Sequence, residues 1–385
     1  MITITQEPFD FYPAYNNSFL KFNTAYDTSR AEITIDAEGP FTIFPALDNK
    51  TYIFNLKEII TSLINENRFA DEVQVPTITA QDETWHEDDT SLTAEYTVKI
   101  KIFELNGPGN DELEKTYSFS KAVQQFGDPK FENKARVLLP SDDGVNFEFS
   151  MWRGFPFDFT VLEQEGYFRI LSLSGPWENL LTIEIDSPET PRPRRFFLHG
   201  TKVPPDYVGW ESLFGDTYTK TRWRIREGAT IGGVFTTRAN LDINIPFPKC
   251  GVYLKWFNAQ GGWSYHLFDE FYRHNIAGQE INRVSANNFE LIHENFTGKE
   301  IITGREGEQE FRLRTTIENE WEKRNLMSLI TSPKVYLWSL HEPYNYNGNW
   351  LSVKVSSTGF THATKHHKYP IEVIVELPEI NTQTL

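Results

Sequence analysis

The stretch VYLKWFNAQGGWSYHLF, residues 252–268, contains the sequence features that decide the fold. Two apolar runs flank residues 258–262, a short polar segment that ends in two glycines. Such runs around a glycine-containing turn are typical of a β-hairpin, because glycine adopts the positive φ that tight turns need. We therefore predict a hairpin over residues 253–268 in which Trp256 is buried, Gly261 and Gly262 set the turn, and Trp263 is at least partly exposed.

Strand patterns recur along the rest of the chain. From Leu92 to Ile102, apolar residues alternate with Thr, Glu and Lys at period two, which indicates a half-buried strand. Shorter strand-like runs recur along the chain and are separated by turn residues, for example AEITID, FDFTVLE, LDINIPF and PIEVIVEL. The aromatic content of 15% suits packing across strands. We predict a mainly β protein with two or three β-sandwich or barrel domains and two flanking α-helices.

Two segments have the sequence pattern of an α-helix. In the first, Asn55 and Glu58 have the spacing of a capping box. Its apolar face comprises Leu56, Ile59, Ile60, Leu63 and Ile64. In the second, Thr315 and Glu318 have the same spacing, and Pro333 stops the helix. Its apolar face comprises Ile317, Trp321, Met327 and Ile330.

The chain of 385 residues is long enough for two or three domains. Proline-rich stretches, SPETPRPRR and VPPDY, suit surface crossings, and IPFPKC suits a junction between domains. We place boundaries near residues 128 and 248. They define an N-terminal β domain with one helix (1–128), a middle β domain (129–248) and a C-terminal β domain with one helix (249–385).

Charge and cysteine content exclude several classes of protein. The chain has 54 Asp and Glu against 37 Lys and Arg, a net charge of −17 that repels phosphate and argues against specific nucleic-acid binding. A single cysteine, Cys250, excludes an intrachain disulfide and a zinc site built on paired cysteines. No apolar run is long enough to span a bilayer, so we expect no membrane insertion and synthesis in the cytoplasm.

The segment HATKHHK contains His362, His366 and His367, and the first two have the i, i+4 spacing that chelates a metal on a helix. Strand patterns bracket the segment, with Gly359 and Pro370 nearby, so a loop explains it better. We predict no metal site here.

Acidic groups at residues 85–89, 269–270, 293–295 and 341–343 offer the paired carboxylates that a glycosidase uses. With 54 acidic residues in the chain, such groups arise by chance and suit solvated loops. The sequence contains no nucleophile elbow, zinc-protease helix, phosphate-binding glycine loop or dinucleotide fingerprint. We predict no enzyme activity, no catalytic residue and no cofactor.

Tryptophans offer a further class of site, because their ring faces stack on sugars. Trp256 and Trp338 lie in strand patterns and Trp321 on a helix face, which predicts core packing. Trp85 and Trp263 lie beside polar turn residues and are the candidate contacts for a glycan or a partner protein.

The hairpin resembles a segment of tail structural proteins from phages and prophages of Bacteroidetes. In those proteins a YLxWxNxxGGWxYxLF-like hairpin precedes a helix, a SPxVYL strand, a WxxVxV strand and a closing xIEVxxELP strand. The matching pieces here are residues 253–268, 332–337, 350–355 and 371–378, in that order. The resemblance covers about the last third of the chain and is carried by fold residues, so no functional residue follows from it.

This resemblance implies a structural virion protein of the distal tail, hub or baseplate. Such a protein assembles in the host cytoplasm into a ring homo-oligomer and contacts other tail proteins. Two alternatives stay open: a carbohydrate-binding adhesin that recognises host surface glycans, and a glycoside hydrolase.

Overall fold

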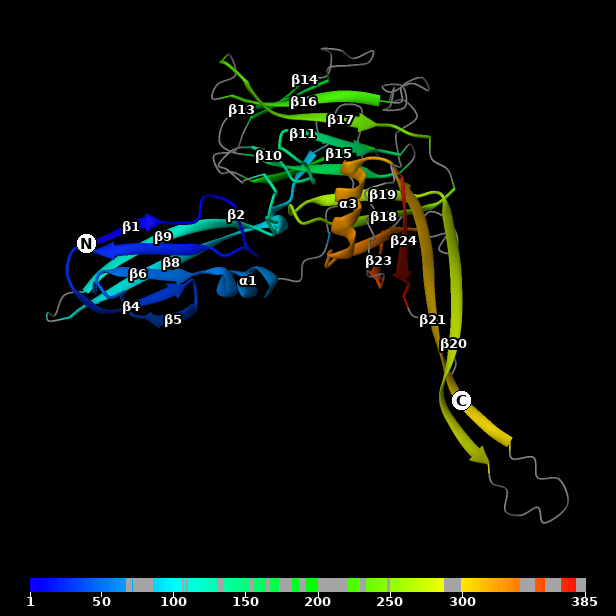
Figure 1. The fold of residues 1–385 in the computed structure, drawn as a ribbon, viewed down its shortest axis with the longest axis horizontal. Helices are drawn as coiled ribbons and strands as arrows, with labels where there is room; N and C mark the ends of the chain where they lie inside the picture. The colour runs from blue at the N-terminus through cyan, green and yellow to red at the C-terminus, as the bar shows by residue number, and fades with distance from the viewer. Residues whose placement is uncertain are drawn as a thin grey trace. The chain divides into compact units, whose positions relative to one another are not determined.

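The computed structural model describes residues 1–66, 71, 86–105, 107, 110–129, 135–152, 155–163, 167–172, 182–186, 192–199, 220–228, 233–247, 250–286, 299–339, 350–356 and 368–378 (Figure 1). The chain divides into two compact units. Unit 1 comprises Met1–Pro246 with Asn258–Ser264, and unit 2 comprises Phe247–Phe257 with Tyr265–Leu385. The division after Pro246 falls close to the predicted boundary near residue 248. The boundary near residue 128 lies inside unit 1 and stays a prediction.

The first part of unit 1 contains two sheets around one core. A three-stranded sheet has the order β1 (Ile2–Gln6), β3 (Phe19–Thr24) and β6 (Thr51–Asn55). A five-stranded sheet has the order β2 (Tyr12–Pro13), β9 (Asn110–Ser120), β8 (Thr93–Glu104), β4 (Thr28–Ile35) and β5 (Glu38–Ile43). The 3-10 turn η1 (Thr90–Leu92) leads into β8, the strand predicted from its alternation.

Helix α1 (Lys57–Glu66) confirms the first predicted helix. Asn55 accepts a hydrogen bond from the Lys57 backbone N–H at 3.2 Å, the capping contact expected of it. Ile60 and Ile64 are buried in the same core as Phe22 and Ile33. The apolar spacing therefore places the helix against both sheets.

The second part of unit 1 also contains two sheets. One has the order β10 (Arg136–Val137), β12 (Phe157–Leu162), β15 (Pro193–His199) and β7 (His86–Asp88). The other has the order β11 (Asn146–Ser150), β17 (Thr236–Asn244), β16 (Lys220–Gly228), β13 (Tyr167–Ser172) and β14 (Thr182–Asp186). The Phe149 ring of β11 stacks on the Phe157 ring of β12 with centroids 5.1 Å apart, so the two sheets pack face to face.

Unit 2 is built on one seven-stranded sheet. Its order is β19 (Trp263–Phe268), β18 (Val252–Phe257), β22 (Val335–Trp338), β23 (Trp350–Val355), β24 (Tyr369–Glu376), β21 (Lys299–Ile317) and β20 (Phe271–Ala286). Helix α3 (Glu320–Ile330) buries Leu326 and Leu329 in a core shared with Trp256 and Phe311. The mainly β fold class with two flanking helices is thus confirmed over the described residues.

The second helix begins later than predicted. Thr315 and Ile317 belong to β21, where they pair with Ile371 and Tyr369 of β24, and Asn319 occupies the N-cap position of α3. The period-two burial of β21 continues through Ile317, so sheet pairing decides the conformation that the capping-box spacing predicted as helix. Met327, predicted on the apolar face, is 50% exposed. Among the described residues, no helix has the length and apolar character needed to cross a membrane.

Candidate interaction surface and groove

The hairpin over residues 252–268 is confirmed, and both of its strands are buried along their whole length. Trp256 is 0% exposed, as predicted. Trp263 is also 0% exposed, so the prediction that it is partly exposed is wrong. Its ring lies 5.8 Å from the guanidinium carbon of buried Arg195, and this packing removes it as a candidate glycan contact. The other candidate, Trp85, lies outside the described residues.

The turn of the hairpin is held by Asn258. Its side-chain oxygen accepts hydrogen bonds from the backbone N–H groups of Gln260 (2.9 Å) and Gly262 (3.1 Å), and its amide nitrogen donates to the Leu138 carbonyl at 3.0 Å. Gly261 has φ +86°, the left-handed conformation predicted for the turn. Gly262 is needed for a different reason, because a Cβ there would lie 2.3 Å from the Leu138 carbonyl oxygen.

A buried ion cluster links β7, β12 and β15 in unit 1. Arg195 is 1% exposed and donates to Asp158 at 2.9 and 2.8 Å and to Asp71 at 2.5 Å. Asp89 contacts the same guanidinium at 3.4 Å. A guanidinium therefore fills the centre of these carboxylates, and among the described residues no group of His, Cys, Asp or Glu suits a metal ion.

A second buried pair lies next to this cluster. Glu163 is 1% exposed, and its Oε2 lies 3.3 Å from Nη2 of Arg194, which also donates to Asp88 at 3.0 Å. Burial raises the pKa of Glu163 to about 7, because desolvation outweighs the attraction of Arg194 and Arg192. Glu163 and Arg194 are both closed off from solvent, whereas the Asp88 side chain is 31% exposed.

Among the described residues of unit 2, strands β20 and β21 form a long two-stranded ribbon. The two strands pair from Phe271↔Arg314 to Ala286↔Lys299, whereas β24 pairs with β21 only over Glu310–Ile317 of the latter. The paired residues 276–286 and 299–309 therefore continue past the end of β24 as a two-stranded ribbon (Figure 1). No element was predicted from the sequence over residues 271–314, so this ribbon was missed.

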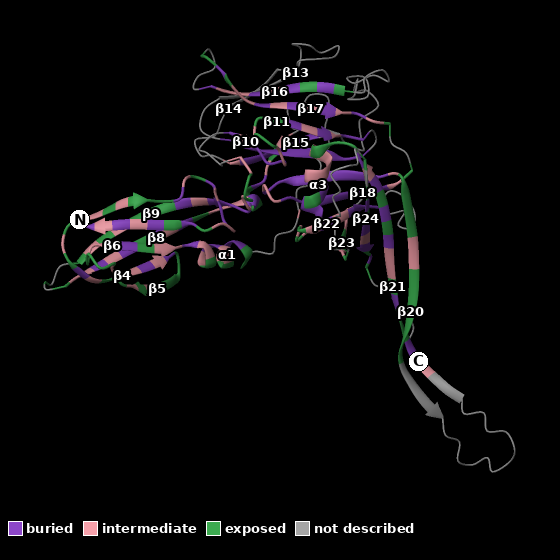
Figure 2. Ribbon diagram, in the orientation of Figure 1, coloured by how far each residue is buried: buried purple, intermediate pink, exposed green. Residues whose placement is uncertain are grey.

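Strand β20 combines an open edge with exposed apolar side chains. It is the last strand in the order of the sheet and, among the described strands, pairs with β21 alone. Figure 2 shows the coloured part of the strand, residues 271–281, as mostly exposed. The exposed side chains are Phe271 (53%), Tyr272 (43%), Ile276 (64%) and Ile281 (52%). An unpaired strand edge with such side chains is a template for pairing with another chain.

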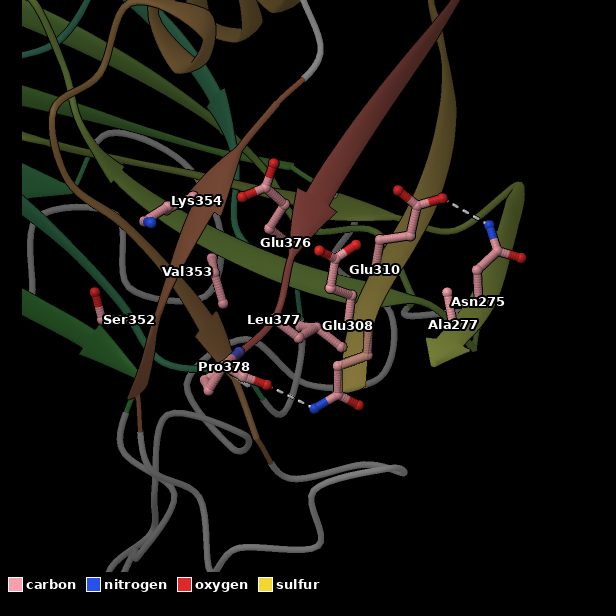
Figure 3. A pocket seen from close by; sticks show the side chains of 11 residues that line it. Asn275, Ala277, Glu308, Glu310, Ser352, Val353, Lys354, Glu376, Leu377 and Pro378 are labelled. Carbon is pink, nitrogen blue, oxygen red and sulfur yellow. Dashed lines mark hydrogen bonds between the residues drawn. The ribbon is translucent and has the colours of Figure 1, made fainter. Parts of the chain in front are cut away.

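A groove of about 700 Å³ lies at the base of the ribbon (Figure 3). Its walls are residues 275 and 277 of β20, 308–310 of β21, 352–354 of β23, and 376–378 at the end of β24. Asn275 donates to Glu310 at 2.8 Å, and Gln309 donates to the Pro378 carbonyl at 2.9 Å. Sequence reasoning missed the groove, because its walls are spread over about a hundred residues of chain.

The remaining predicted groups divide between described and undescribed residues. Asp88 and Asp89 form the ion pairs given above, and Glu270 lies 3.8 Å from Arg314 as a surface ion pair. Each of these three acids therefore lies next to an arginine. The acidic groups at 293–295 and 341–343, and the histidines His362, His366 and His367, lie outside the described residues.

The chain matches no family model and no curated protein. Solved structures show distant similarity. Fibronectin(III)-like modules of Clostridium thermocellum CbhA share 10% identity over 64% of this chain and 95% of theirs, with a TM-score of 0.19. A titin immunoglobulin tandem shares 9% identity over 64% of this chain and 97% of its own, with a TM-score of 0.21. The periplasmic chaperone SfaE shares 9% identity, with a TM-score of 0.18.

Proposed function

We propose that this chain is a structural protein of a bacteriophage tail and that it works by assembly with copies of itself and with other tail proteins. The observation that carries the proposal is the β20–β21 ribbon, which continues past β24 with an open edge and exposed apolar side chains. A two-stranded hairpin is marginally stable alone in water, so a ribbon of this length gains stability when a neighbouring subunit covers it.

The tail assignment itself rests on the sequence resemblance of the last third of the chain. In a closed ring, each ribbon lies on the next subunit, and the same contact repeats until the ring closes. The proposal assigns no catalytic residue, metal or cofactor. The glycan-binding alternative loses its described candidate, because Trp263 is fully buried.

Shortening the ribbon tests the assembly role. Gln279 and Glu306 are paired, so residues 280–305 can be replaced by an Asn-Gly turn that joins them. We expect the full chain to sediment as an oligomer that grows with concentration, and the shortened chain to sediment as a monomer with an unchanged melting temperature. A full chain that stays monomeric at high concentration, or equal assembly of the shortened chain, contradicts the proposal.

The tail assignment needs a separate measurement. Mass spectrometry of purified virions from the phage that encodes the chain is expected to detect it at a constant ratio to the other tail proteins. Its absence from virions rules out the tail role even if the purified protein forms rings.

A further inference from the structure

Strand β20 presents backbone hydrogen-bonding groups at the outer edge of the seven-stranded sheet (Figure 1). The Leu377 N–H donates to the Gln309 carbonyl, so odd-numbered residues of β21 bond to β24 and even-numbered residues bond to β20. Even-numbered residues of β21 pair with odd-numbered residues of β20. The even-numbered residues of β20 therefore direct their N–H and C=O groups away from β21, among them His274, Ile276 and Gly278.

This edge lacks the features that protect most edge strands from pairing. Its regular part, residues 271–280, pairs with β21 without a β-bulge, and the first bulge comes at Ile281. The regular part contains no proline and no lysine, whereas β5, the edge strand of the five-stranded sheet, contains Pro40. Ile276, at the middle of the regular part, is 64% exposed. The edge is therefore open to another strand.

The charges of β20 favour a second copy of this chain as that strand, in antiparallel direction. The regular part of β20 contains one basic residue, Arg273, and one acidic residue, Glu280, so two such strands carry no net charge against each other. A parallel pair in register would place each of these charges beside its own copy, which is unfavourable. An antiparallel pair centred on Ile276 instead places Arg273 opposite Gln279. The neighbour of Gln279 on β21 is Glu306, which gives the guanidinium an acid on the same face.

The same arrangement brings exposed apolar side chains together. Ile276 lies opposite Ile276 of the second copy, and Phe271 lies opposite Ile281 at each end. These three side chains are 64%, 53% and 52% exposed in the single chain. The direction of the backbone groups agrees with this register, because His274 lies opposite Gly278 and all of these even-numbered residues point outward.

We infer that β20 pairs along its open edge with β20 of a second copy of this chain, antiparallel and centred on Ile276, so that two ribbons form one continuous sheet. Main-chain hydrogen bonds between His274, Ile276 and Gly278 of the two copies hold the contact. The inference rests on the proposed function, because both need copies of the chain to assemble through the ribbon. A two-fold contact joins copies in pairs, so a ring needs a further contact, for which the faces of the ribbon remain.

Sedimentation equilibrium of the full chain tests the contact. The variant Ile276→Lys places two ammonium groups opposite each other at the centre of the pair, and we expect it to weaken association at least tenfold. Its melting temperature is expected to stay unchanged, because the side chain is 64% exposed in the single chain. The matched control is Ile53→Lys on β6 of unit 1, where the side chain is 59% exposed and association is expected to be unaffected.

Disulfide cross-linking tests the register without disrupting the contact. The background is Cys250→Ser, because Cys250 is exposed. Two cysteines from Ile276→Cys would lie opposite each other with Cα atoms about 5.5 Å apart, within the range of a disulfide, so oxidation is expected to yield a covalent dimer. Gly278→Cys is the matched variant, because an added Cβ there meets no atom within 4 Å. Its two copies would lie roughly 14 Å apart along the strands, so no cross-link is expected.

Three results would overturn the inference. They are undiminished association of Ile276→Lys, absence of a cross-link in Ile276→Cys, and an equal cross-link in Gly278→Cys. The ribbon-shortened chain lacks Ile281 and with it two of the three apolar pairs, so it is expected to be monomeric here as well. If it is monomeric while Ile276→Lys associates normally, the inference fails and the assembly role of the ribbon stands. If the shortened chain assembles like the full chain, the proposed function itself fails.

Discussion

Trp256 on β18 donates a hydrogen bond from its indole nitrogen to the Ser328 hydroxyl of α3 at 2.8 Å. Ser328 in turn donates to the Asn325 carbonyl at 2.6 Å. The contact joins the hairpin to a helix far along the chain and gives the buried indole its polar partner. It explains why a tryptophan, rather than a phenylalanine, fits at the centre of this core.

Removing the Ser328 hydroxyl is expected to destabilise the protein. The variant Ser328→Ala leaves the Trp256 indole N–H buried without this acceptor, at a cost of about 1–3 kcal/mol. Urea unfolding measures the loss. The control is Met327→Ala on the same helix, where the side chain is 50% exposed and the expected change is within about 0.5 kcal/mol. Equal effects of the two substitutions would contradict this role for the hydroxyl.

Trp256→Ala and Trp263→Ala are expected to destabilise the protein by similar amounts. Both side chains are 0% exposed, so each truncation removes a large packed ring and costs about 3–5 kcal/mol. Thermal unfolding of both variants checks this. If Trp263→Ala left the melting temperature unchanged and abolished binding to a glycan array, the adhesin alternative would return.

Gly262→Ala is expected to destabilise the hairpin turn. The added Cβ would lie 2.3 Å from the Leu138 carbonyl oxygen, a backbone atom just after β10 whose own N–H is bonded to the Thr160 carbonyl, so the cost is about 1–3 kcal/mol. Gly278→Ala in the β20–β21 ribbon is the matched control, because an added Cβ meets no atom within 4 Å there. A loss no larger than that of the control would show that the turn does not dock closely on Leu138.

Arg195→Met is expected to be much more damaging than an arginine loss at the surface. It leaves Asp71, Asp89 and Asp158 buried without their shared cation, which costs about 3–5 kcal/mol. Arg222→Met breaks a pair with Asp242 in which the arginine is 56% exposed, and the expected cost is below about 1 kcal/mol. Urea unfolding at neutral pH compares the two, and similar losses would refute a central role for Arg195.

The features that could be predicted from the sequence are those that depend on the local spacing of apolar residues. The alternation of β8, the apolar face of α1 and the hairpin around Gly261 are each encoded within a dozen or so neighbouring residues, and each is confirmed. These features follow from side-chain direction along a strand or a helix, which no distant contact had to decide.

The predictions were wrong, or missed a feature, where residues far away in the sequence determine the local conformation or burial. Trp263 looked exposed because its neighbours in sequence are polar, yet Arg195 covers it in the fold. Thr315 had the spacing of a helix cap, but β24 supplies a strand partner that overrides it. The groove is lined by residues of β20, β21, β23 and β24, and these strands become neighbours only through the order of the folded sheet.

His266 is expected to make the protein less stable in acid. Its side chain is 7% exposed, its Nε2 lies 3.1 Å from the Thr315 hydroxyl, and burial lowers its pKa from 6.5 to about 3. Below about pH 6.5 the unfolded chain therefore binds a proton at this histidine that the folded chain excludes. The free energy of unfolding falls by about 1.4 kcal/mol per pH unit from this cause, from about pH 6.5 down to about pH 3.

The variant His266→Gln isolates this contribution. Burial raises the pKa of Glu163 and gives the opposite trend between about pH 4.5 and 7, so the comparison must be made between variant and unmodified chain at each pH. Between pH 7 and pH 5, the unmodified chain is expected to lose about 2 kcal/mol more than the variant, measured by urea unfolding. Parallel pH profiles for the two proteins would show that His266 takes up its proton in the folded state and that its burial carries no acid penalty.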